Sequence, residues 1–186
     1  ALFIIESALN KGLLFSSVWS VGNSKQIGVE DILEYMDKNF NPNVDSKVKM
    51  LYIEQIKNPD KLLYHASSLI KKGCRIAAIK AGKRAASSHT GAIASSDSAV
   101  EALFRKAGIV RCFSREELTT VACIFTLKEV KGKNCAVITH AGGPAVMLAD
   151  ALSKGRLNVP DLNGPIAEEL KSKLFPGAAV GNPIDI

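Results

Sequence analysis

The chain has 186 residues, of which 47% are hydrophobic, so it is long enough to bury a core and to form one full domain and part of a second. Its formal net charge is +6, but the lysines are scattered and no basic cluster is interleaved with aromatic side chains. This pattern disfavours a nucleic-acid function. No apolar run is long enough to cross a bilayer, and the first residues carry Glu6 inside their apolar run without a basic leader. We therefore expect a cytoplasmic protein that does not contact a membrane.

Helical and strand-like patterns alternate along the first two thirds of the chain. Apolar spacing and turn residues predict helices over 1–11, 29–36, 59–72, just after Ser98, and 116–127. β-branched and apolar runs predict strands over 13–21, 48–53, 74–80 and 109–113. Ser98 and Glu101 match a capping box, and Gly12 and Gly73 lie where helices are expected to end.

This alternation predicts a doubly wound α/β domain, in which parallel strands are joined by crossover helices. Ligands bind such sheets beyond the carboxyl ends of the strands. Three polar loops leave strands at that end, namely Gly22 to Ser24, Glu54 with Gln55, and the loop that carries His89. We expect these loops to converge on one edge, where Lys80, Lys83 and Arg84 would favour an anion.

The pattern restarts after a short charged linker over 129–133. We expect a strand over 135–139 and then a helix with Ala145, Leu148, Ala149 and Leu152 directed inward. The helix begins at Gly142-Gly143-Pro144, which is typical of an anion-binding helix start. Because the chain opens directly on a helix and stops after two strands of this unit, we expect a piece of a longer protein. The expected domains are 1–128 and a truncated one over 134–186.

The four cysteines lie in or beside apolar runs and form no CxxC pair: Cys74, Cys112, Cys123 and Cys135. Metal and redox sites use such short spacings. We therefore expect reduced thiols that pack as small hydrophobic side chains, and no metal site.

Three histidines are candidates for chemistry. We expect His65 at the surface or edge of its helix, while His140 begins the glycine loop of the second unit and either touches a ligand or is only a loop residue. His89 stands among small residues. A neutral imidazole can accept a phosphoryl group and pass it on, and a carboxylate on its other nitrogen fixes the tautomer. Glu54, at the end of the neighbouring strand, is placed to do so. The residues alone leave open whether His89 is a nucleophile or is merely hydrogen-bonded into its loop.

Five segments in a fixed order carry a family resemblance. They are SVGNS with DILEYM, LYIEQIKNP, RAASSHTGAIASSD with RKAGIVR, THAGGPAVMLADAL, and VGNPIDI. Together they resemble the NDP-forming acyl-CoA synthetases, the superfamily that includes succinyl-CoA synthetase and ADP-forming acetyl-CoA synthetase. The resemblance covers nearly the whole chain and implies two flavodoxin-like units with helices on both faces of each sheet, the second unit incomplete.

The resemblance also implies a reaction. These enzymes interconvert acyl-CoA, phosphate and ADP (or GDP) with a free acid, CoA and ATP (or GTP), with Mg²⁺ bound beside the nucleotide. Phosphate attacks the thioester to give an acyl phosphate, a histidine takes the phosphoryl group, and its loop carries the group to the nucleotide. By the match, His89 would be the carrier and Glu54 the carboxylate that holds its ring. The expected phosphate-binding residues are Thr90 and Gly91 beside the histidine and the helix starts at Ala1, Gly142 and Gly143.

The same resemblance implies partners. An acyl-CoA-binding domain and an ATP-grasp domain, on this chain or on another subunit, would bind most of the nucleotide, CoA and Mg²⁺, and the complete enzyme would be an oligomer that acts on a small carboxylic acid. One alternative is a non-catalytic ligand-sensing module, as in some protein acetyltransferases, although retention of both His89 and Glu54 argues against it. A second is an assembly module that only docks the nucleotide-binding partner.

Overall fold

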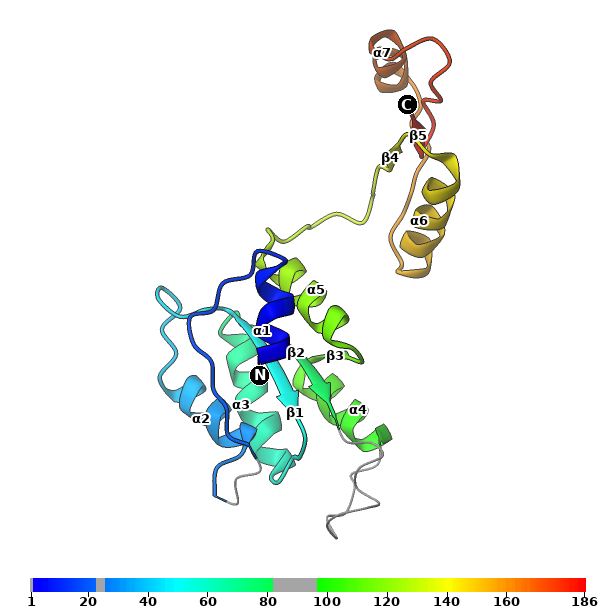
Figure 1. Cartoon of the computed structure of the whole chain (residues 1–186). Helices are drawn as coiled ribbons and strands as arrows, with labels where there is room; N and C mark the ends of the chain where they lie inside the picture. The colour runs from blue at the N-terminus through cyan, green and yellow to red at the C-terminus, as the bar shows by residue number, and fades with distance from the viewer. Residues whose placement is uncertain (1, 23–25, 82–96) are drawn as a thin grey trace. The chain divides into compact units, whose positions relative to one another are not determined.

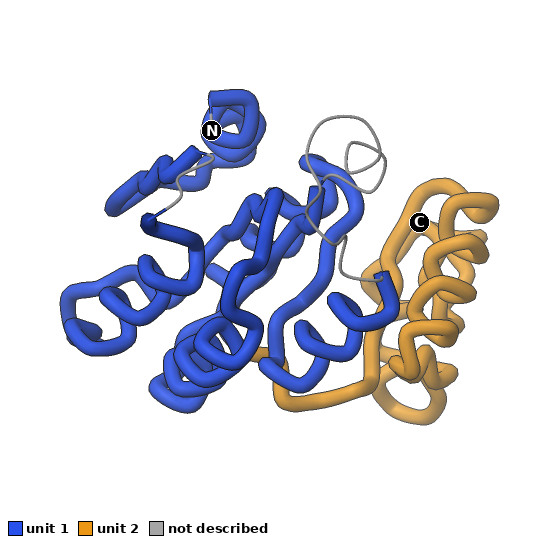
Figure 2. The backbone as a smooth tube through the Cα atoms, turned by 90° about the horizontal axis from the view of Figure 1, so that it is seen from below, with its two compact units in different colours: residues 1–128 blue, residues 129–186 orange. Residues whose placement is uncertain are grey.

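The computed structural model describes residues 2–22, 26–81 and 97–186 (Figure 1). The chain forms two compact units, Ala1–Lys128 and Glu129–Ile186, which Figure 2 distinguishes by colour.

Unit 1 is built on a parallel sheet with the strand order β1-β2-β3. The strands are β1 (Val48–Ile53), β2 (Arg75–Lys80) and β3 (Val110–Cys112). Ile53 pairs with Lys80 and Ile79 with Cys112, so the carboxyl ends of all three strands lie at one edge. The predictions of strands over 48–53, 74–80 and 109–113 are confirmed.

Helices cover both faces of this sheet (Figure 1). They are α1 (Leu2–Leu9), α2 (Val29–Lys38), α3 (Pro59–Lys71), α4 (Asp97–Ala107) and α5 (Arg115–Thr126). Side chains alternate along β2: Ile76 and Ala78 pack with α2, α3 and α4, whereas Ala77 and Ile79 pack with α1 and α5. The predicted doubly wound α/β fold is therefore confirmed.

Local sequence explains where these helices begin and end. The Asn58 side chain accepts a hydrogen bond from the Lys61 amide at 3.0 Å, and Pro59 occupies the first turn of α3. Gly73 follows α3 with φ of +95°, a conformation that other residues rarely adopt. Ser114 caps α5 by accepting from the Glu117 amide at 3.1 Å.

Two predictions about unit 1 are wrong. Residues 13–21 form no strand, because Leu13 is the only buried apolar side chain in this stretch, while Leu14 and Trp19 are exposed and no ladder joins the stretch to β1. Trp19 instead packs against Tyr35 of α2. The capping box also fails, since α4 already begins at Asp97 and Ser98 lies inside its first turn.

Unit 2 pairs two short parallel strands, β4 (Ile138–Thr139) and β5 (Ile184–Asp185). Between them lie α6 (Gly142–Lys154) and α7 (Pro165–Lys173). The buried apolar residues of this unit are Val137, Ala145 and Ile184. The predicted inward face of α6 is thus only partly correct, because Leu148 is 49% exposed and Ala145 alone is buried.

The four cysteines are free thiols, as predicted. Cys74 and Cys112 are buried, and burial, with a smaller contribution from Glu117, raises the pKa of Cys112 to about 11. Within the described parts of the chain, no helix is both long and apolar enough to cross a membrane.

Candidate functional site

Glu54 stands where the sequence placed it, directly after the last residue of β1 and exposed at the carboxyl edge of the sheet. Gly142 and Gly143 form the first turn of α6 in unit 2 and are also exposed. The other predicted site residues, Ala1, His89, Thr90 and Gly91, lie outside the described residues. The same holds for Asn23, Ser24, Lys83 and Arg84.

Lys80 ties the ends of β1 and β2 together at this edge. Its ammonium donates to the backbone oxygens of Glu54 and Ala81, both at 2.7 Å, and the Ala81 amide donates to the Ile53 oxygen at 2.8 Å. Burial lowers the pKa of Lys80, and the nearby charge of Arg111 lowers it further, while Glu54 and Asp97 oppose the shift. The sequence suggests that Lys80 favours an anion, but two of its three ammonium donors are used by carbonyl oxygens.

Arg111 on β3 holds the start of α4 at the same edge. Its side chain is 7% exposed, and its guanidinium pairs with the Asp97 carboxylate and, at 3.1 Å, with Glu101. It also donates to the backbone oxygen of Asp97 at 3.3 Å. Burial lowers the pKa of the guanidinium, but the hydrogen bonds to these two carboxylates outweigh burial and raise it. Sequence analysis missed this anchor, since an arginine inside the short run IVRCF gives no sign of its partners.

These contacts place both neighbours of residues 82–96 at the edge of the sheet that carries Glu54. Ala81 follows β2, and Asp97 is bound to Arg111 of β3, so the chain leaves and re-enters the described structure at the carboxyl edge. Glu54 is exposed at that edge, and its backbone is fixed by Lys80. This edge is where ligands bind doubly wound sheets.

The start of α6 has a different environment. Thr139 at the end of β4 accepts a hydrogen bond from the Ala141 amide at 3.0 Å, which shapes the turn into the helix. The Asp185 carboxylate lies close by, since a Cβ added to Gly142 would be 3.4 Å from its Oδ2. The helix start therefore exposes backbone amides but has a negative charge beside it.

Of the two positions predicted for His65, the surface or an edge of its helix, the structure excludes the surface. His65 is 8% exposed, and its Nδ1 lies 2.8 Å from Oδ2 of the buried Asp37. Asp37 also accepts from Ser68 at 2.7 Å and Lys72 at 2.8 Å. This cluster joins α2 to α3 and is structural.

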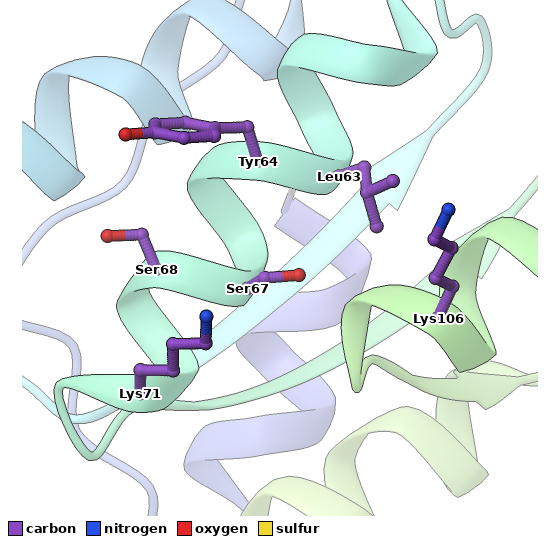
Figure 3. A pocket seen from close by; sticks show the side chains of 6 residues that line it. All are labelled: Leu63, Tyr64, Ser67, Ser68, Lys71 and Lys106. Atoms are coloured by element: carbon purple, nitrogen blue, oxygen red, sulfur yellow. The ribbon is translucent and has the colours of Figure 1, made fainter.

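A surface pocket of about 310 Å³ opens beside α3 (Figure 3). It is lined by Leu63, Tyr64, Ser67, Ser68, Lys71 and Lys106. Ser67 and Ser68 already donate to Ala107 and Asp37, and the two lysines lie in the last turns of α3 and α4, at the end opposite Glu54. The pocket is therefore separate from the candidate site. Among the residues that the structure describes, no group of three His, Cys, Asp or Glu side chains is arranged to hold a metal ion.

Comparison with known proteins agrees with this architecture. Residues 1–125 match the family described as succinyl-CoA ligase like flavodoxin domain. The chain is 36% identical to the ADP-forming acetate–CoA ligase II subunit alpha of Pyrococcus furiosus, in a match covering 98% of this chain and 40% of that protein. It is also 36% identical to the ADP-forming acetate–CoA ligase of Methanocaldococcus jannaschii, covering 100% of this chain and 26% of that protein.

A solved structure gives the same result. It is a dinucleotide forming acetyl-coenzyme A synthetase 1 from Ca. Korarchaeum cryptofilum in complex with phosphate and ADP. The TM-score is 0.80 at 29% identity, and the match covers 98% of this chain and 39% of that one. The chain thus spans 26% to 40% of the length of these relatives. The chain belongs to the succinyl-CoA ligase like flavodoxin domain family, and with it to the NDP-forming acyl-CoA synthetase superfamily.

Proposed function

We propose that this chain is the phosphohistidine-bearing part of an NDP-forming acyl-CoA synthetase, with His89 as the phosphoryl carrier and Glu54 as the carboxylate that orients its ring. The complete enzyme would convert acyl-CoA, phosphate and ADP into a carboxylic acid, CoA and ATP. CoA-binding and ATP-grasp domains outside this chain would hold CoA, the nucleotide and Mg²⁺. The names of the relatives, which are ADP-forming acetate–CoA ligases, support this reaction class.

The observation that carries the proposal is the position of Glu54. It is exposed at the carboxyl edge of the sheet, next to Ala81 and at the same edge as Asp97, the two residues that flank the segment containing His89. A carboxylate there can accept a hydrogen bond from one imidazole nitrogen, which leaves the other nitrogen as the nucleophile. The phosphoryl group then passes from the acyl phosphate to the ring, releasing the carboxylate product, and from the ring to ADP.

The helix start at Gly142 and Gly143 would bind phosphate in this proposal, and Ala1, Thr90 and Gly91 are the other candidate phosphate-binding residues. Exposed backbone amides and the positive end of the helix dipole favour an anion there without basic side chains.

The deciding experiment measures protein-bound phosphate. The full-length protein and its His89→Ala variant are incubated with Mg²⁺ and γ-labelled ATP or GTP. We expect acid-labile, base-stable label on the parent protein and none on the variant. A folded parent that takes no label from either nucleotide would refute phosphoryl transfer and favour the ligand-sensing module.

Glu54→Gln tests the orienting role. We expect labelling of His89 to slow by roughly 10- to 100-fold, because the amide no longer favours the reactive tautomer and holds the ring less firmly. Thermal stability should change little, since the Glu54 side chain is exposed. Glu168→Gln, which removes an exposed carboxylate from α7, is the control for lost charge and should label normally. An unchanged labelling rate in Glu54→Gln would exclude the orienting role.

A further inference from the structure

Glu30 in the first turn of α2 is a buried carboxylate with an unusual set of partners. It is 2% exposed, and its Oε1 accepts hydrogen bonds from the backbone amides of Lys57 at 3.0 Å and Asn58 at 2.9 Å. Both amides belong to the turn that follows β1. One acidic side chain of α2 therefore binds a turn 27 and 28 residues further along the chain.

The turn that Glu30 binds is the one that carries Glu54. At its start, Lys80 donates to the Glu54 backbone oxygen, and at its end Glu30 accepts from Lys57 and Asn58. Asn58 is also the N-cap of α3. Residues 54–58 are thus hydrogen-bonded at both ends. At the second end the acceptor is the Glu30 carboxylate, which lies at the positive end of the α3 dipole.

Burying the Glu30 carboxylate costs free energy that packing alone does not recover. The second oxygen, Oε2, is buried and has no hydrogen-bond partner among the described residues, although a buried polar atom without a partner is unfavourable. Glycine at position 28 leaves room for the carboxylate where it stands, since a Cβ there would lie 2.7 Å from Oε2 and the carboxylate would have to shift. An apolar side chain would fill this position without an unpaired oxygen but would leave both amides unsatisfied.

We infer that Glu30 is a positioning residue for Glu54. By fixing the end of the 54–58 turn, its carboxylate keeps Glu54 at the edge of the sheet in the orientation that the reaction needs. The inference rests on the proposed function, in which Glu54 orients the ring of His89.

A double-mutant cycle in the full-length enzyme tests this role. Single-turnover labelling of His89 is measured for Glu30→Ala, Glu54→Gln and the double variant, at a temperature at which circular dichroism shows each to be folded. We expect Glu30→Ala to slow labelling by roughly tenfold or more, with an unchanged dependence on nucleotide concentration. In the Glu54→Gln background, Glu30→Ala should slow labelling by less than about twofold, because the effect of Glu30 acts through Glu54. Glu30→Gln keeps an oxygen acceptor and should restore part of the rate.

Leu33→Ala is the matched control for lost stability. Leu33 lies one turn further along α2 and is fully buried, so its truncation destabilises the same helix while it leaves in place the two hydrogen bonds that Glu30 accepts from the turn. If Glu30→Ala slows labelling no more than Leu33→Ala does, or equally in both backgrounds, the positioning role is wrong while the proposed function stands. If Glu54→Gln labels at the normal rate, the orienting role fails and the inference fails with it.

Discussion

Asp37 shows how much one buried side chain contributes to the joint between α2 and α3. Its carboxylate is 5% exposed and accepts hydrogen bonds from His65, Ser68 and Lys72. Burial raises the pKa of Asp37, but these hydrogen bonds outweigh burial, led by Lys72, and the net shift is downward. The folded protein therefore stabilises the charged form.

This shift predicts a loss of stability in acid. Above pH of about 5 both states carry the charge, and the contribution of Asp37 is complete. As the pH falls through about 4, Asp37 becomes protonated in the unfolded chain but stays ionised in the folded chain. Its contribution to stability therefore declines until Asp37 is protonated in the folded chain as well. We expect Asp37→Ala to lower the free energy of unfolding by about 3 kcal/mol at neutral pH and to reduce the acid dependence below pH of about 4. Urea unfolding at several pH values measures both.

Asp45→Ala is the control for this prediction, because Asp45 is exposed in a loop and accepts one hydrogen bond, from the Asn41 amide. This substitution should lower the free energy of unfolding by less than about 1 kcal/mol. Equal decreases in the two variants would show that the buried cluster does not stabilise the fold.

Sequence patterns predicted the position of Glu54 but not the burial of Glu30 and Asp37, for a physical reason. The position of Glu54 follows from the apolar run before it, which had to be a strand. Helix α2 reads as amphipathic through Val29, Ile32, Leu33 and Met36, and acidic residues on such a helix are normally solvated. Yet Glu30 and Asp37 stand three residues before and four after the buried Leu33, so they share its face. Their spacing was visible, but the amides and the lysine that satisfy them come from distant parts of the chain.

At the scale of elements, the start of α6 has one feature that favours anion binding and one that opposes it. The first turn exposes the amides of Gly142 and Gly143, which favour phosphate, but the Asp185 carboxylate lies beside Gly142. At short range the repulsion between a carboxylate and a phosphate is worth about 1 kcal/mol when both are exposed to water.

Removing that charge should strengthen phosphate binding. We expect Asp185→Asn to raise the affinity of the α6 start for inorganic phosphate by roughly fivefold. The measurement is a titration that follows the amide NMR signals of Gly142 and Gly143. Asp150→Asn is the control, since it removes an exposed carboxylate from a later turn of the same helix and should have a smaller effect. A decrease in affinity in Asp185→Asn would mean that the carboxylate instead holds the amides in a binding conformation.

The wrong prediction over 13–21 has an element-scale cause. Its apolar and aromatic residues have the composition of a strand, but composition does not supply a hydrogen-bonding neighbour. In the structure Leu13 and Phe15 pack beside Val48 and Met50 of β1 without forming a ladder. Element type was predictable wherever a strand and its crossover helix follow each other closely, as in 48–80.

At the scale of the whole molecule, the two units differ in how much core they bury. Unit 1 contains continuous clusters on both faces of its sheet, with Phe104 and Ile76 among the fully buried side chains. Unit 2 spans residues 129–186 and buries three apolar side chains. A small unit that buries so little apolar surface is marginally stable by itself.

This difference predicts separate behaviour in hydrogen exchange. Amides of β2 should exchange only through global unfolding of unit 1. Amides of α6 and α7 should exchange through openings that require much less free energy. Phe104→Ala should destabilise unit 1 by about 3 to 5 kcal/mol and speed exchange in β2, because the ring is fully buried between α3, α4 and the sheet. Exchange in α6 should be unchanged. Ile184→Ala should do the reverse, removing a side chain that is 4% exposed and leaving β2 protected. If either substitution speeds exchange equally in both units, the two units unfold as one cooperative body, and their cores are not independent.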